Sequence, residues 1–234
     1  MSESGKKILI ATVFWKRHDI LKMFCKNNGK FADILAVGSE KKRSRSLAKS
    51  LGCYYYEAKN RPLAAKFDAR IKWFMARPEY SHILLLGSDD LICERTFNRI
   101  DKERFNYDLI SWKDIYFYNL KSESGIYSCG YKHKRLDEPF APGRCISRRY
   151  LQSIGGTLWP HRNAGGPDKN AWHTNLRFCK NQIILSLKQN DSIIVDIKTE
   201  ENITSLEAIG RATNSNPISD DEKRRIRRMI NDAR

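Results

Sequence analysis

The sequence predicts an α/β fold with a mostly parallel, Rossmann-like sheet that carries helices on both faces. Over the first ninety residues, apolar runs of strand length alternate with stretches of helical spacing. The run at residues 83–86 (ILLL) is apolar throughout, as in a strand buried on both faces. A chain of 234 residues with 41% hydrophobic and 30% charged residues is long enough for one large α/β domain or two small ones.

The first half of the chain supplies most of this alternation. Apolar residues share one face of a predicted helix at residues 20–28, with Asp19 as a candidate N-cap and Gly29 at its end. Pro78 follows the end of a longer predicted helix. The elements expected before the buried run are strands at 6–13, 32–37 and 53–56, and helices at 20–28, 44–51 and 63–76.

The second half predicts a small antiparallel part. Aromatic and β-branched residues favour two strands before turn-forming residues near Gly125 and Gly130, which indicates a hairpin. Residues 139–143 (PFAPG) are expected to form a loop, and Ser147 to cap a helix. The further expected elements are helices at 94–101, 147–154 and 170–181, and strands at 108–112, 115–118, 144–146 and 193–197.

The C-terminus is expected to be a linker followed by a basic helix. Residues 202–217, which contain NSNP, have linker composition, and Ser219 with Glu222 has the spacing of a capping box. Four arginines flank the apolar residues of this amphipathic helix, which could dock on phosphates, on a membrane surface, on a partner or on the chain itself. We therefore divide the chain into a domain at 1–201 and a linker with helix at 202–234.

The charge balance points to polyanionic partners. Lys and Arg number 43 against 27 Asp and Glu, a net charge of +16, which raises the local concentration of anions. No apolar run approaches the roughly 20 residues of a membrane span, and no signal peptide precedes the first strand. Six scattered cysteines without a CxxC pair indicate packing thiols in a cytoplasmic compartment.

Two adjacent carboxylates follow the buried run. Gly87 and Ser88 lead into Asp89 and Asp90, and ligands of open α/β sheets bind beyond the carboxyl ends of the strands. Adjacent acids there could hold a hard divalent cation and, with it, a diphosphate. The alternative is an acidic turn, because Gly, Ser and Asp are also turn formers.

In order and spacing, residues 6–200 resemble a family 2-type glycosyltransferase of the GT-A fold. LLLGSDDL resembles the acidic motif of that family, with Gly87 in the place of its first acid. The resemblance implies that Asp89 and Asp90 are metal ligands for Mn²⁺ or Mg²⁺. It also implies a nucleoside-diphosphate-sugar donor, bound by Thr12, Gly38, Glu40, Asn60, Lys66 and Ser88.

The resemblance extends to the acceptor side. APGRCISRRYLQSIGG is similar to the acceptor-side segment of the family, after which an acid commonly supplies the catalytic base. Asp168 in GGPDKNAW is the candidate base; the alternative is a loop residue or an N-cap. His173 is a second candidate for the same role.

The resemblance therefore implies a metal-dependent glycosyltransferase with a hydroxyl acceptor. Three basic clusters and interspersed aromatic residues favour a modified base in DNA as the acceptor, as in a phage-type enzyme working in the host cytoplasm. A polysaccharide or glycoconjugate acceptor is the first alternative. A non-enzymatic nucleic-acid-binding protein is the second, and a nucleotidyltransferase is disfavoured because residues 12–19 contain no glycine. The aromatic residues involved are Trp112, Tyr116, Phe117, Tyr118, Tyr127 and Tyr131.

Overall fold

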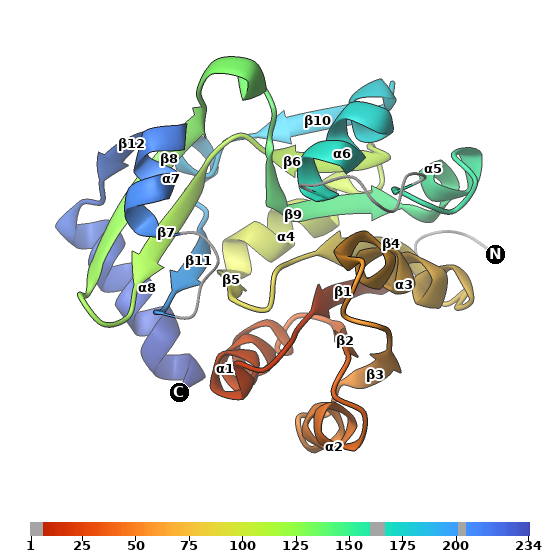
Figure 1. Cartoon of the computed structure of the whole chain (residues 1–234). Helices are drawn as coiled ribbons and strands as arrows, with labels where there is room; N and C mark the ends of the chain where they lie inside the picture. Colours follow the sequence, from red (N-terminus) through yellow and green to blue (C-terminus); the bar gives the residue numbers. More distant parts are fainter. Residues whose placement is uncertain (1–6, 160–166, 201–204) are drawn as a thin grey trace.

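A computed structural model describes residues 7–159, 167–200 and 205–234 (Figure 1). Its larger sheet has seven strands in the order β10-β6-β9-β4-β1-β2-β3. Neighbouring strands are parallel except at β9, which is antiparallel to both β4 and β6. The strands are β1 (Lys7–Val13), β2 (Asp33–Gly38), β3 (Tyr54–Glu57), β4 (Tyr80–Leu85), β6 (Leu109–Trp112), β9 (Phe140–Ser147) and β10 (Gln182–Leu185). The mostly parallel sheet predicted from the sequence is confirmed.

Helices cover both faces of this sheet because its central strands are apolar on both sides. In β1, Ile8 and Ile10 belong to one hydrophobic cluster, and Leu9 and Ala11 to the other. The first cluster includes residues of α1 (His18–Asn28), α2 (Lys42–Ser50) and α4 (Glu94–Glu103). The second includes residues of α3 (Leu63–Met75), α5 (Arg148–Ser153) and α6 (Pro167–Thr174).

A smaller sheet of five strands lies beside the first, in the order β12-β8-β7-β11-β5 (Figure 1). Only β7 and β11 are parallel within it. Its strands are β5 (Asp90–Ile92), β7 (Ile115–Asn119), β8 (Ser124–Tyr131), β11 (Ile194–Lys198) and β12 (Thr213–Pro217). This sheet is the small antiparallel part that the sequence predicts.

The basic C-terminal helix, α8 (Asp220–Ala233), docks on the chain itself. Ile226 and Ile230 are buried in the first cluster, and α8 packs against α1. The Tyr116 hydroxyl donates to Glu222 at 2.8 Å. The capping box of Ser219 and Glu222 is present as predicted. No helix in the described ranges is long and apolar enough to cross a membrane.

Several local expectations were wrong. Arg17, not Asp19, is the N-cap residue of α1, and the exposed Asp19 bonds Lys22 one turn further on. Residues 140–143 of the expected loop at 139–143 form the first half of β9, because cross-strand pairing with β6 extends the strand. Gly130, expected in a turn, lies within β8. Short 3₁₀ helices occur at His133–Arg135, Leu176–Phe178 and Lys188–Asn190, so the helix expected at 170–181 is divided in two.

The expected linker also has regular structure in its described part. It contains α7 (Leu206–Ala212), which Ser205 caps by accepting from the backbone N–H of Ala208, and then β12, which pairs with β8. Pairing with a neighbouring strand gives the polar NSNP segment a strand conformation that its composition does not indicate. The predicted domain boundary at residues 201–202 lies outside the described residues.

Candidate active site

The acidic motif joins the two sheets. The chain leaves the larger sheet at the end of β4, turns through residues 86–89 and enters the smaller sheet at Asp90. Within the turn, the backbone N–H of Gly87 donates to Asp90 Oδ2 at 2.5 Å. A Cβ at Gly87 would lie only 2.8 Å from Asp89 Oδ1. The glycine in the first position of the motif therefore gives the two carboxylates room to fold back over the turn.

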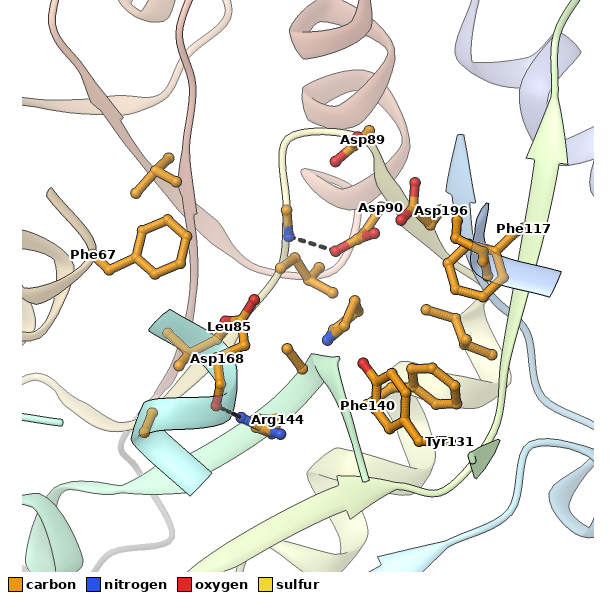
Figure 2. A pocket seen from close by; sticks show the side chains of 18 of the residues that line it. Phe67, Leu85, Asp89, Asp90, Phe117, Tyr131, Phe140, Arg144, Asp168 and Asp196 are labelled. Atoms are coloured by element: carbon orange, nitrogen blue, oxygen red, sulfur yellow. Dashed lines mark hydrogen bonds between the residues drawn. The ribbon is translucent and has the colours of Figure 1, made fainter. Parts of the chain in front are cut away.

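A third carboxylate completes this site. Strands β5 and β11 are antiparallel, and their register places Asp196 directly opposite Asp90. Asp89, Asp90 and Asp196 each offer an oxygen, and the three oxygens lie within 4.8 Å of one another. Figure 2 shows them together on one side of a cavity. Sequence reasoning missed Asp196, although a single charge inside the apolar run IIVDI was a usable indication.

The three carboxylates are crowded and poorly compensated. Burial and the neighbouring Asp89 raise the pKa of Asp196 to about 7. Burial, Asp196 and Asp89 raise the pKa of Asp90 well above its ordinary value. Two cations oppose this effect, since Lys198 Nζ donates to Asp196 Oδ2 at 2.8 Å and Arg17 pairs with Asp89 at 2.9 Å.

This acidic triad fits a hard divalent cation. Opposite oxygens around octahedral Mg²⁺ lie about 4.2 Å apart, given bonds of about 2.1 Å, close to the spread of the triad. Asp196 Oδ1 is buried and has no hydrogen-bond partner among the described residues. Carboxylate oxygens are preferred ligands of Mg²⁺ and Mn²⁺. The donor set, the orphaned oxygen and the mutual repulsion all agree with the metal expected from the sequence.

The triad forms one wall of a cavity of about 400 Å³. Arg144 from β9 and Asp168 from α6 lie on the opposite wall (Figure 2), and Arg70 from α3 also lines the cavity. Aromatic side chains form a third side, with Phe117, Phe140 and Tyr131 lying together in Figure 2. The cavity therefore has an acidic wall, a guanidinium wall and an aromatic side.

The structure brings Asp168 to the triad's cavity. Asp168 lies in the first turn of α6, across the cavity from Asp89 and Asp90 (Figure 2). Its backbone carbonyl accepts from Arg144 at 3.4 Å. His173, the second candidate base, points elsewhere, since its Nε2 lies 3.7 Å from Glu138 Oε2 and the residue does not line the cavity. Of the two candidate bases, Asp168 is favoured by its position on the cavity.

Three of the expected donor-binding residues meet at the ends of β1 and β2. Lys66 is buried and donates to the Phe14 carbonyl at 2.5 Å and to Asn60 Oδ1 at 3.1 Å. Burial lowers the pKa of Lys66 to about 8, opposed by the charge of Glu40. Glu40 accepts from the backbone N–H of Lys16 at 2.9 Å and borders a more open hollow of about 890 Å³. Arg17 lines this hollow as well and reaches Asp89.

The other three expected donor-binding residues take different places. Thr12 and Gly38 are fully buried and line neither the cavity nor the hollow. A Cβ at Gly38 would lie 2.8 Å from the Cβ of Ser44, so this glycine allows close packing of α2. Ser88 is partly exposed in the turn beside Asp89. Their donor-binding roles stay predictions.

Comparisons with known proteins bear on the fold. No protein-family model matches the sequence, and no curated protein sequence is similar to it. Among solved structures, the S. aureus TarS fragment 1–349 is similar with a TM-score of 0.54 at 11% identity, over 82% of this chain and 60% of that one. The same fragment in complex with UDP-GlcNAc gives 0.53 at 12% identity, over 96% of this chain and 65% of that one.

The chain has the GT-A fold. It spans about three fifths of the TarS fragment and 37% of a longer TarS structure, to which it is similar with a TM-score of 0.53. The GT-A fold expected from the acidic motif and the order of the elements is thus confirmed. In this fold the acidic triad stands where β4 of the larger sheet passes into the smaller one.

Proposed function

We propose that the protein is a glycosyltransferase that moves a sugar from a nucleoside diphosphate to a hydroxyl group. The observation that carries the proposal is the triad of Asp89, Asp90 and Asp196 on the wall of a cavity beyond the end of a central parallel strand. The shared fold with TarS, which has been solved with UDP-GlcNAc and with UDP, supports this class of donor.

The triad would hold Mn²⁺ or Mg²⁺ in this enzyme. Such an ion supplies positive charge that neutralises the diphosphate as the sugar–oxygen bond breaks. Lys198 holds Asp196 in place through its 2.8 Å bond, and Arg17 holds Asp89. Glu40, Asn60 and Lys66, clustered at the ends of β1 and β2, are the proposed contacts of the nucleoside.

Asp168 is the proposed general base. In a direct displacement, the acceptor oxygen attacks the anomeric carbon, the bond to the diphosphate breaks, and the nucleoside diphosphate leaves. The proton of the acceptor hydroxyl passes to the Asp168 carboxylate, which lines the cavity opposite the triad. This arrangement leads to inversion at the anomeric carbon.

The acceptor class rests on charge. The net charge of +16 supports a polyanion, and a hydroxyl-bearing base in DNA is the proposed acceptor of that kind. Stacking on exposed aromatic residues no longer supports it, because five of the six candidate aromatic residues are buried in the core and only Tyr131 is partly exposed. DNA binding should weaken steeply with salt; a response independent of salt would favour a neutral polysaccharide.

A thermal-shift titration tests the proposed donor site. UDP and UDP-GlcNAc are added with and without Mn²⁺, because a ligand of the folded state raises its stability by mass action. We expect a Mn²⁺-dependent rise in Tm that is lost in Asp89→Asn. Asp232→Asn serves as the control, since Asp232 is exposed near the end of α8.

Loss of the rise in both variants, or a full rise in Asp89→Asn, would refute the metal role. If no nucleotide shifts the Tm of the wild type, the proposal fails. A salt-dependent titration with DNA would then test the remaining alternative, a nucleic-acid-binding protein without catalytic activity.

A further inference from the structure

The guanidinium of Arg144 is buried in the cavity wall and has no hydrogen-bonded carboxylate among the described residues. Its side chain is 3% exposed, yet its bonds to described residues are to two backbone carbonyls, those of Pro139 at 2.8 Å and Asp168 at 3.4 Å. Its Nε is buried without any partner in the described part of the chain. Buried charges are normally paired, so this cation requires an explanation.

The Glu138 carboxylate beside Arg144 is already engaged. Glu138 Oε1 lies 3.9 Å from Arg144, beyond hydrogen-bond distance. Both oxygens of Glu138 accept instead from Arg135, at 2.8 and 2.5 Å. Arg135 also stacks on the ring of Tyr131, with its guanidinium carbon 3.6 Å from the ring centre. Glu138 is therefore hydrogen-bonded to Arg135, and no carboxylate of the described residues accepts a hydrogen bond from Arg144.

A second buried arginine lines the same cavity and also lacks a hydrogen-bonded carboxylate among the described residues. Arg70 is 4% exposed, and its bonds to described residues are 3.4 Å contacts with the carbonyls of Phe67 and Ala11. The charge of Asp168 acts on both Arg70 and Arg144. With Arg135, three guanidiniums thus line the cavity, while Asp168 and Glu138 supply two negative charges.

Arg148 shows what a purely structural arginine looks like in this fold. It donates to four backbone carbonyls at 2.5–2.9 Å and does not line the cavity. Arg144 has two such bonds, one of them 3.4 Å long, an Nε without a partner among the described residues, and a place on the cavity wall. The difference indicates that Arg144 serves a ligand rather than the packing.

We propose that the wall around Arg144 binds an anionic group, a phosphate or a carboxylate, carried by a substrate of the transfer reaction. The inference deepens the proposed function and rests on it. Guanidinium groups bind these anions through charge-assisted, often bidentate hydrogen bonds. The wall faces the acidic triad across the cavity, so this anion is separate from the diphosphate proposed at the triad. It is brought either by the acceptor or by an acidic sugar on the donor.

The test uses inorganic phosphate as the probe, on the full chain saturated with UDP and Mn²⁺, so that the diphosphate site is filled. We expect phosphate to bind, and Arg144→Gln to weaken its binding about tenfold or more. Arg144→Lys keeps the charge and should retain part of the affinity. Arg104→Gln is the matched control, because Arg104 is also buried but bonds Asp101 and Ser81 outside the cavity.

A second pair of probes separates the two sources of the anion. If the donor sugar carries it, UDP-glucuronate binds about tenfold more tightly than UDP-glucose, and Arg144→Gln removes the preference. If the acceptor carries it, the two donors bind alike, and phosphate binds in the presence of UDP-glucose. Either result supports the anion site.

Two results would overturn the inference and spare the proposed function. One is tight UDP binding with neither phosphate binding nor a preference for the acidic sugar. The other is phosphate binding that Arg144→Gln and Arg144→Lys leave intact. Absent UDP binding would refute the proposed function instead, and phosphate titrated alone would then decide whether Arg144 binds an anion. Circular dichroism identifies a variant that does not fold, in which case Arg144→Lys carries the comparison.

Discussion

Gly143 lies in β9 at a point where a side chain has no room. Its φ is +81°, and a Cβ there would lie 2.4 Å from Ile194 Cδ1 and 2.8 Å from Trp112 Cδ1. Gly143→Ala therefore combines a left-handed backbone with overlap in the core. We expect the free energy of unfolding in urea to fall by about 2–4 kcal/mol.

Gly155 separates the cost of the left-handed backbone from the cost of steric overlap. It has a similar φ of +78°, but no described atom beyond its chain neighbours lies within 4 Å of a Cβ built on it. Gly155→Ala therefore keeps the backbone cost and removes the overlap, and it should lower the free energy of unfolding by only about 1 kcal/mol. Equal losses in the two variants would contradict this account.

At the scale of single residues, the sequence marks acids that local chemistry or a family resemblance singles out. Asp89 and Asp90 follow an apolar strand directly, the resemblance implied Asp168, and the structure places all three on one cavity. Asp196 was missed because its place depends on the register of β11 against β5, which are about a hundred residues apart in the chain. Arg144 was missed for the same reason, since its burial beside α6 results from packing between distant segments.

Among the elements, α3 and α5 are joined by one side chain. Arg148, the first residue of α5, donates to the carbonyls of Phe74 and Met75 at the end of α3 at 2.8 and 2.9 Å. It also reaches the Arg77 and Tyr80 carbonyls. These carbonyls lose a charged donor in Arg148→Met, and we expect the free energy of unfolding to fall by about 3 kcal/mol.

Arg149, next to Arg148 in the sequence, provides the control for the effect of Arg148→Met. Arg149 forms a two-bond pair with Asp108, at 3.0 Å each, but its side chain is 68% exposed. An exposed ion pair contributes little, so Arg149→Met should cost about 0.5 kcal/mol. Urea denaturation of both variants measures the difference, and a similar cost for both would refute the special role of Arg148.

At the scale of elements, strands and helices with strong periodicity were predictable. Strands β1 to β4 and the capped helix α8 lie within a few residues of their expected bounds, whereas the short strand β5 was not expected. The segments at 139–143 and 213–217 were not, because Pro, Gly, Ser and Asn favour loops locally. Pairing with β6 and β8 overrides that preference.

Across the whole molecule, the acidic motif is also the passage between the two sheets. Gathering one buried and two partly buried carboxylates where β5 pairs with β11 works against stability, since like charges lie opposite one another. Such a feature persists at sites where function requires it. The metal-free protein should therefore gain stability when one of the charges is removed.

Asp196→Asn tests this expectation. The pKa of Asp196 is raised from 3.8 to about 7, so between these values the folded chain binds more protons than the unfolded chain, and stability falls as pH rises. We therefore expect the variant to raise the Tm of the metal-free protein by a few degrees at about pH 8. The gain should shrink at about pH 5, where the wild-type carboxyl is already protonated.

Added Mn²⁺ should reverse the order of the two proteins. The ion stabilises the wild type by mass action and gives Asp196→Asn a smaller rise, because an amide is a weaker ligand than a carboxylate. Thermal denaturation of both proteins, with Mn²⁺ and with a chelator, measures the four values. If Mn²⁺ raised the Tm of both proteins equally, Asp196 would not be a metal ligand. If the metal-free variant had a lower Tm than the wild type at about pH 8, repulsion between the carboxylates would not be the dominant effect there. The expected pattern, a variant more stable alone and less stable with the ion, would mean that the junction of the two sheets is built for a cation.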